Sequence, residues 1–271
     1  MRIGTMMRFT PNEGGEQGRL MDRAADYARR IEAAGFHNIW VGDSLGRGRP
    51  TLDPLVELAT LAAVTRKVEL GIGVLQLPLR HPIELAHRVQ SVQALSGNRL
   101  VLGVGSGSTK DDFDLLGYDY DKRFGMLRSW LKTMQGVWRG ESALSVWPGC
   151  EGGPPILIGA WRSHRWITLA AKEYQGWTPS GRYSSWEDLE AGMKVFHEAG
   201  GTNAVLANTA VDLGDRPGSV ELAKLAEPAL IGTPDEVRQK LKRMQDIGFN
   251  EVLLVSHHNV LEDIERVRDM L

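Results

Sequence analysis

At 271 residues, of which 42% are hydrophobic, the chain is long enough to bury one sizeable core, and we expect a single domain over residues 1–271. Its formal net charge is −2, and its 32 basic and 34 acidic residues are spread along the whole chain. This pattern gives no electrostatic footprint for nucleic acid or for an acidic membrane surface, and it favours a small-molecule partner.

Cysteine content and the N-terminus indicate the cellular setting. Cys150 is the only cysteine, so no internal disulfide can form, and its Pro/Gly-rich surroundings contain no base that would activate a thiol. The segment from Met1 to Thr5 lacks the apolar run of a signal peptide, and no later segment is apolar for long enough to span a bilayer. The sequence therefore predicts a soluble, cytoplasmic protein.

Short β-rich runs alternate with longer stretches of helical period, a pattern typical of parallel strands joined by crossover helices. In chain order we expect strands at Arg2–Met7, Asn38–Gly42, Val68–Leu75, Leu100–Val104, Ile156–Ile158, Gln175–Thr178, Ala204–Val211 and Glu251–Val255.

The intervening helices have recognisable faces and ends. The first buries a face that includes Ala24 and Ile31 and stops at Gly35, and Asp53-Pro54 opens the second. Thr233 to Glu236 combines an N-cap, a first-turn proline and a capping-box glutamate, and opens a helix that ends near Gly248. The last helix is expected over Asn259–Leu271. An apolar stripe at helical spacing, predicted to be core, consists of Phe124, Leu127, Trp130, Leu131, Met134 and Trp138.

Eight strand and helix pairs without internal repeats favour an α/β fold of the closed (β/α)₈ TIM-barrel type over an open doubly wound sheet. Two longer connections interrupt the alternation and are expected to be short insertions. Thr109–Lys122 is polar and acidic, and Glu141–Pro155 is rich in proline and glycine.

In such a barrel the functional residues lie on the loops that follow the strands, because these loops converge on one face. The residues at these positions are Arg8, Asp43, Ser44, Gln76, Gly103 to Ser108, Gly159, Ala160, Ser180 to Arg182, Asp212 and Ser256 to His258. Asp43 could accept a hydrogen bond from a substrate or a ring edge, or it could cap the following loop. His257 could supply a proton, whereas the adjacent pair His257-His258 does not predict a metal site, because neighbouring side chains point apart.

Two of these segments suit a cofactor. The closely spaced glycines at 103–108 allow backbone N–H groups to approach a planar ring or a phosphate, whereas the acidic segment after them does not fit a dinucleotide-binding helix start. Ser180-Gly181-Arg182 offers a hydroxyl, a backbone N–H and a guanidinium just before a helix expected to begin near Ser184 or Ser185, a combination that suits a phosphate. The same tripeptide could equally be an ordinary turn with a solvated arginine.

A further set of short segments follows in a specific order along nearly the whole chain. These are Ala34 to Phe36, Ile39 to Asp43, Leu58 to Ala63, Gly71 to Val74, Leu79 to Pro82, Leu100 to Gly107, Pro155 to Ala160, Gly176-Trp177 and Gly232 to Pro234. In this order they resemble the bacterial luciferase-like flavin- or deazaflavin-dependent oxidoreductases.

The resemblance implies a barrel, usually a dimer, with the isoalloxazine ring of the cofactor against a kinked, bulged third strand, here Gly71 to Gln76, including Gly71, Gly73 and Val74. It implies that the ring or its side chain is lined by Gly105, Ser106, Gly107 and Ser108, with Asp43 facing the pocket. It implies a phosphate at Gly159, Ala160, Ser180, Gly181 and Arg182.

Two departures narrow the function. Some deazaflavin-dependent sugar-phosphate dehydrogenases have a catalytic histidine where this chain has Ser44 and a glutamate where it has Ser108, so that activity is not expected. Asp43, Ser44 and His257 remain the candidate catalytic residues.

We therefore expect a monooxygenase that uses reduced FMN and oxygen on a small organic substrate. The sequence shows no nicotinamide-binding fingerprint, and a separate reductase is the expected source of reduced flavin. Three alternatives stay open: hydride transfer with a 5-deazaflavin coenzyme, a cofactor-binding or structural relative without turnover, and a non-redox phosphate-binding barrel enzyme. The last would need a paired acid and base, or a lysine at a strand end.

Overall fold

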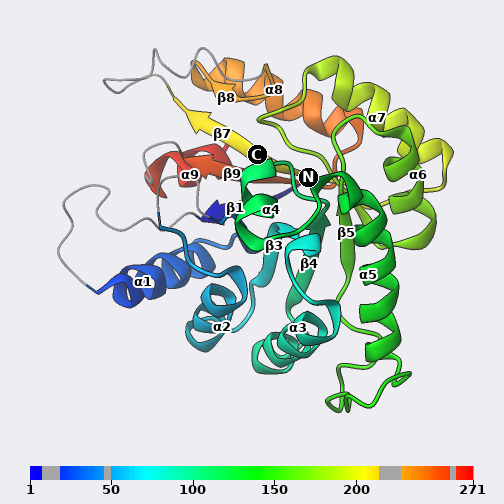
Figure 1. Cartoon of the computed structure of the whole chain (residues 1–271). Coiled ribbons are helices and arrows are strands. Elements are labelled where there is room, and N and C mark those ends of the chain that lie inside the picture. The colour runs from blue at the N-terminus through cyan, green and yellow to red at the C-terminus, as the bar shows by residue number, and fades with distance from the viewer. Residues whose placement is uncertain (8–18, 46–49, 214–226, 257–260, 271) are drawn as a thin grey trace. The chain divides into compact units, whose positions relative to one another are not determined.

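The computed structural model describes residues 1–7, 19–45, 50–213, 227–256 and 261–270 (Figure 1). The chain divides into two compact units. The first comprises Met1–Met7, Ile31–Trp40 and Leu157–Leu271, and the second comprises Arg8–Arg30 and Val41–Ile156.

The first unit contains most of the strands. These are β1 (Arg2–Met7), most of β2 (Asn38–Val41) and of β5 (Ile156–Gly159), β6 (Gly176–Thr178), β7 (Val205–Asp212), β8 (Leu230–Ile231) and β9 (Glu251–Ser256). The strands β1, β9, β7 and β8 are neighbours in this order, and each of these pairs, like β5 with β6, is parallel. Strands such as β1 and β9 are almost continuously buried, and most of their residues are apolar.

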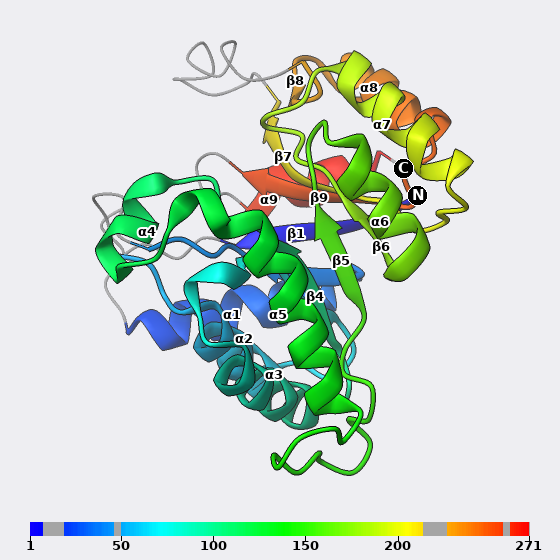
Figure 2. The same cartoon turned by 45° about the vertical axis from the view of Figure 1, so that its right-hand side comes forward.

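The helices of this unit are α6 (His164–Glu173), α7 (Trp186–Glu198), α8 (Pro234–Ile247) and α9 (Leu261–Arg268). The helix α7 contacts both α6 and α8, as Figure 2 shows. Capping boxes begin α7 and α8: Ser185 and Asp188 pair in the first, and Thr233 and Glu236 in the second. These caps fix the first turns that follow β6 and β8.

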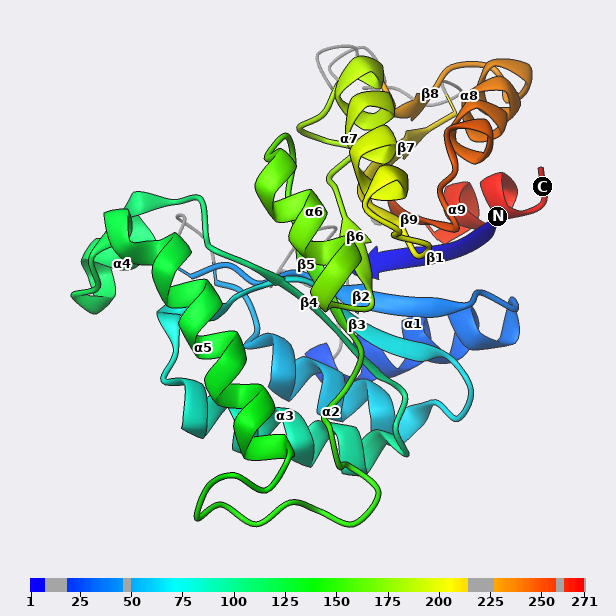
Figure 3. The same ribbon diagram turned by 90° about the vertical axis from the view of Figure 1, so that its right-hand side faces the viewer.

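The second unit contains two strands in parallel, β3 (Glu69–Gln76) and β4 (Leu100–Gly105). Its helices are most of α1 (Leu20–Ala33), α2 (Pro54–Val64), α3 (Pro82–Ser96), α4 (Lys110–Leu116) and α5 (Arg123–Trp138), with one-turn helices η1 (Leu77–Leu79) and η2 (Tyr120–Lys122). The helix α3 packs against both α2 and α5, and these three helices lie on one side of β3 and β4 (Figure 3).

The predicted strand and helix alternation is confirmed. All eight expected strands are present, with ends within one residue of the expected ones, and the described part of the chain adds the two-residue β8. The expected first helix, the helix after Asp53 and the helix from Thr233 to Gly248 are present, and the described part of the last helix is α9.

The expected connection Thr109–Lys122 contains the short helices α4 and η2, and Phe113 of α4 is buried. One expectation about the second unit was wrong in part. In the predicted core stripe of α5, Phe124 is exposed and Trp130 only half-buried, while the other members are buried. The segment Glu141–Pro155 has no helix or strand, as expected.

The prediction of one domain stays a prediction. Within the described residues, no helix combines the length and the apolar character that crossing a lipid bilayer requires.

Candidate functional site

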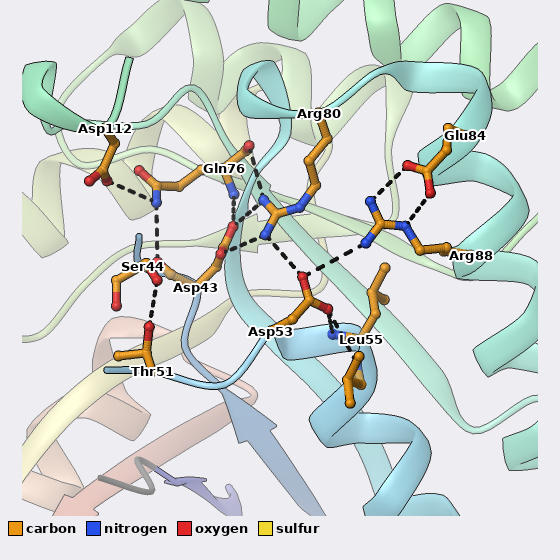
Figure 4. A network of polar contacts seen from close by, with 11 residues as sticks. Asp43, Ser44, Thr51, Asp53, Leu55, Gln76, Arg80, Glu84, Arg88 and Asp112 are labelled. Atoms are coloured by element: carbon orange, nitrogen blue, oxygen red, sulfur yellow. Dashed lines mark hydrogen bonds and ion pairs between the residues drawn. The ribbon is translucent and has the colours of Figure 1, made fainter. Parts of the chain in front are cut away.

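In the second unit, the carboxyl ends of β3 and β4 carry the polar residues that the sequence singled out. Parallel strands end at the same edge, and this edge is where (β/α) folds place their chemistry. Asp43 lies two residues after the end of β2, Gln76 is the last residue of β3, and Gly105 is the last residue of β4. Figure 4 shows that Asp43 and Gln76 belong to one polar network, together with an arginine, Arg80, that follows η1.

The carboxylate of Asp43 lies at the centre of this network. Its Oδ2 accepts hydrogen bonds from the backbone N–H of Gln76 and from Nη1 of Arg80, both at 2.7 Å, and its Oδ1 accepts one from Nη2 of Arg80 at 2.9 Å. The side chains of Asp43 and Arg80 are 3% and 13% exposed. This is a bidentate, charge-assisted pair shielded from water.

Arg80 is held from a second side by Asp53. The two side chains approach to 3.6 Å, and Asp53 also caps α2 by accepting from the backbone N–H groups of Leu55 and Val56. Burial lowers the pKa of the Arg80 guanidinium, but the hydrogen bonds and charges of Asp43 and Asp53 raise it by more, so its pKa stays above the ordinary value. Arg80 is therefore charged at every pH at which the protein is folded.

The amide of Gln76 is oriented by the two groups that accept hydrogen bonds from its nitrogen. Its Nε2 donates to the backbone oxygen of Asp43 and to Oδ2 of the buried Asp112 in α4, each at 3.3 Å. Its Oε1 faces Gly107, where it lies 3.2 Å from the position that a Cβ would take. Gln76 thus connects the ends of β2 and β3 with the loop that follows β4.

The third strand has the bulge that the resemblance implies. Its register against β4 shifts between Ile72 and Leu75, and the Gly73–Val74 peptide bond is cis. Gly71 is buried, whereas Gly73 and Val74 are partly accessible. Val74 packs closely on Gly105, since a Cβ on Gly105 would lie 2.7 Å from Cγ2 of Val74.

The glycine loop after β4 is shaped by its neighbours. Gly107 has a φ of +79°, and a Cβ there would lie 2.8 Å from the ring of Phe113. Ser106 is half-buried and Ser108 is exposed, and the backbone oxygen of Ser108 accepts a hydrogen bond from the Tyr120 hydroxyl. The loop is held close to β3 while one side of it stays accessible.

Ser44 follows Asp43 and is half-buried. Its backbone oxygen accepts a hydrogen bond of 2.7 Å from the Thr51 hydroxyl, which ties the two ends of the loop between β2 and α2. The third candidate catalytic residue, His257, lies outside the described residues, as do His258 and Arg8.

In the first unit, the predicted phosphate residues lie at the ends of β5 and β6. Gly159 pairs with Thr178, and the backbone oxygen of Ala160 accepts a hydrogen bond from the Trp177 indole. The N–H of Gly181 donates to the backbone oxygen of Ala207, so this amide is already engaged in the protein. Arg182 is exposed, with its guanidinium 5.7 Å from the centre of the Tyr183 ring.

Three hydroxyls beside this segment were not predicted from the sequence. The side-chain oxygens of Thr178, Ser184 and Thr209 are buried and have no hydrogen-bond partner among the described residues. The hydroxyl of Thr209 lies 2.8 Å from the position of a Cβ on Gly181, so it faces the backbone of the predicted phosphate segment.

Comparison with known proteins decides the family. The profile described as luciferase-like monooxygenase matches residues 1–211. The chain belongs to the luciferase-like monooxygenase family, a family of oxidoreductases. The resemblance noted in the sequence is thereby confirmed.

Two relatives of this family member are informative. The chain is 36% identical over 107 residues to 4-hydroxyprotoasukamycin monooxygenase of Streptomyces nodosus subsp. asukaensis, a match that covers 39% of this chain and 29% of that protein. It is 30% identical over 205 residues to an uncharacterized protein of Mycobacterium tuberculosis, covering 68% of this chain and 71% of that protein. Less than a third of the first relative is matched, so its activity as a whole is not transferred.

Solved structures share the fold over the whole chain. The monooxygenase RslO1 of Streptomyces bottropensis superposes with a TM-score of 0.80 at 18% identity, covering 100% of this chain and 97% of that one. The oxygenating constituent of 3,6-diketocamphane monooxygenase from Pseudomonas putida, solved with FMN, gives 0.76 at 15% identity, covering 98% and 96%. An F420-dependent secondary alcohol dehydrogenase, in complex with an F420-acetone adduct, gives 0.76 at 15%, covering 100% and 98%. These likenesses confirm the predicted α/β barrel class of this luciferase-like protein.

Proposed function

We propose that this protein is a monooxygenase that binds reduced FMN and uses oxygen to oxidise a small organic substrate. The observation that carries the proposal is the bulged β3 with its partly accessible Gly73 and Val74 beside the glycine loop of β4. Reduced FMN, when bound, supplies the electrons that activate oxygen, and the protein supplies an oriented site from which water is excluded. The monooxygenases among the relatives support this assignment.

The residues of the second unit fit a flavin ring. Gly105 and Gly107 let Val74 and Phe113 pack closely on the end of β4, and the partly accessible Val74 offers an apolar surface on β3. We propose that the ring contacts Gly71, Gly73, Val74 and Gly105 to Ser108. Backbone amides and a small apolar surface suit a planar ring with a polar edge.

The residues of the first unit fit a phosphate. Thr178, Ser184 and Thr209 supply buried hydroxyls without partners among the described residues, and Arg182 supplies an exposed guanidinium. We propose that Ser180 and Arg182 contact the phosphate, with Gly159, Ala160 and Gly181 forming the backbone around it. The N–H of Gly181 already donates to the protein backbone, so we propose that hydroxyls, and not this N–H, donate hydrogen bonds to the phosphate.

A separate reductase remains the proposed source of reduced FMN. The relative from Pseudomonas putida is described as an oxygenating constituent, which supports a division of the reaction between two proteins.

Hydride transfer with a 5-deazaflavin coenzyme is the second candidate. The F420-dependent structural relative supports it. Such a reaction needs a proton donor beside the ring, and Ser44 stands where some relatives of that type have a histidine. For this reason we place FMN and oxygen first.

The test is a fluorescence and absorbance titration of the purified protein with FMN, riboflavin and the deazaflavin coenzyme. We expect the tightest binding for FMN and weaker binding for riboflavin, which lacks the phosphate. Arg182→Ala should weaken the binding of FMN several-fold and leave that of riboflavin unchanged, because it removes a charge-assisted contact to the phosphate. Arg165→Ala, an exposed arginine of α6, serves as the control.

The other outcomes separate the alternatives. Tighter binding of the deazaflavin than of FMN would support hydride transfer. Binding of neither cofactor would support a non-redox phosphate-binding barrel enzyme. Binding of FMN without substrate-dependent turnover across a broad panel would favour a cofactor-binding relative.

A further inference from the structure

The contacts of Asp43 engage both oxygens of its carboxylate. Its Oδ2 receives two donors and its Oδ1 one, and Arg80 supplies a donor to each oxygen (Figure 4). A bidentate pair of this kind fixes the orientation of both side chains. This geometry suits a residue that positions its neighbours.

The same carboxylate fixes the end of β3. One of its donors is the backbone N–H of Gln76, the last residue of the strand, and the backbone oxygen of Asp43 receives the Gln76 amide. Because Nε2 of Gln76 also donates to Asp112, the orientation of the amide is set from two sides, and its Oε1 faces Gly107. Asp43 thereby controls the side chain that lies between the β3 end and the glycine loop.

Arg80 is itself fixed by residues further from this edge. Asp53 holds its Nη2, and Arg88 reaches the same carboxylate at 3.8 Å and pairs with Glu84 (Figure 4). Asp53 is anchored by its role as the N-cap of α2. A planar guanidinium held by two carboxylates keeps one orientation, and it thereby fixes the orientation of the Asp43 carboxylate.

We infer that Asp43 is a positioning residue: its buried pair with Arg80 holds the end of β3 and, through the Gln76 amide, the glycine loop in the place where they meet the cofactor ring. This inference rests on the proposed function, because it takes the ring to lie against β3. It assigns Arg80 and Gln76 as further positioning residues.

The test compares Asp43→Asn, Arg80→Lys and Gln76→Met with the wild type and with Glu141→Gln. Arg80→Lys keeps the charge but loses the bidentate geometry, and Gln76→Met removes the amide while leaving the ion pair intact. Glu141→Gln is the matched control, because it weakens an exposed pair with Arg139 that lies outside this network. Circular dichroism and thermal unfolding establish which variants fold.

FMN binding and the visible spectrum of the bound flavin are then measured. We expect the folded Asp43, Arg80 and Gln76 variants to bind FMN about tenfold more weakly or worse, the loss typical of one misplaced polar contact, with an altered spectrum of the bound flavin. Glu141→Gln should match the wild type in both. If Asp43→Asn does not fold, Gln76→Met provides the same comparison, because it leaves the Asp43–Arg80 ion pair intact.

The inference is wrong if the folded Asp43, Arg80 and Gln76 variants bind FMN with wild-type affinity and show an unchanged flavin spectrum. The ion pair would then contribute only to the stability of the fold. The proposed function would survive that result, because the wild type would still bind FMN. If the wild type binds neither FMN nor the deazaflavin, the proposed function fails first, and the inference fails with it.

Discussion

Glu57 of α2 is a carboxyl group in an environment that opposes its charge. It is buried, its Oε1 has no hydrogen-bond partner among the described residues, and burial raises its pKa to about 8. Between an unfolded-state pKa of 4.5 and this value, the folded protein binds a proton that the unfolded chain releases. The free energy of unfolding therefore falls as pH rises through this interval, at most by roughly 1.4 kcal/mol per pH unit.

Glu57→Gln should remove this dependence, because the amide cannot ionise. We expect the variant to be more stable than the wild type at pH 8 by an amount on the order of a few kcal/mol, and to resemble it at pH 4.5. Urea unfolding at a series of pH values measures the difference, with the exposed Glu84→Gln as the control. If the free energies of unfolding of the wild type and of Glu57→Gln change with pH in the same way, burial does not oppose the ionisation of Glu57 in the folded protein.

At this scale the sequence predicts positions better than contacts. Asp43, Gln76 and the glycines of β4 were found because they follow strands, and barrel loops converge at that end. Arg80 was not assigned a role, since its partner Asp43 is 37 residues away and no spacing rule connects a one-turn helix to another strand end. The hydroxyls of Thr178, Ser184 and Thr209 were missed because burial without a partner has no signature in the sequence.

At the scale of elements, the predictions succeeded where local chemistry determines the structure. The capping box of α8 is an example: the Thr233 hydroxyl accepts from the backbone N–H of Glu236, whose carboxylate accepts from the N–H of Thr233. We expect Thr233→Ala to lower the free energy of unfolding by about 1 kcal/mol, and Thr233→Ser to have little effect because it keeps the hydroxyl. Urea unfolding checks both, and equal stability of the alanine variant would mean that the cap contributes nothing.

The elements that the sequence missed are those that depend on tertiary contacts. The helix α4 covers only Lys110–Leu116, and the first half of this segment is so polar that its composition indicates a loop. It forms a helix because Phe113 is fully buried and packs edge-on against Tyr120. The strand β8 has two residues, too few to show any periodicity.

At the scale of the whole molecule, the predicted homodimer has a candidate surface on α2 and α3, which pack against each other (Figure 3). Both helices are apolar on their inner faces, and their outer faces expose Val56, Ile83 and Leu95 at 62%, 43% and 70%. Exposed aliphatic side chains on two adjacent helices suit a contact with another protein surface. We propose that a second copy of the chain packs on this face.

Leu95→Glu should convert the dimer to a monomer, because it places a charge on a surface that the second copy would otherwise desolvate. The substitution leaves the fold intact, since Leu95 is exposed within the chain. Leu115→Glu is the matched control, a leucine of α4 with a similar exposure of 68%. Light scattering coupled to size-exclusion chromatography gives the mass of each. A monomeric wild type would refute the dimer, and a Leu95→Glu variant that stays dimeric would move the interface away from α2 and α3.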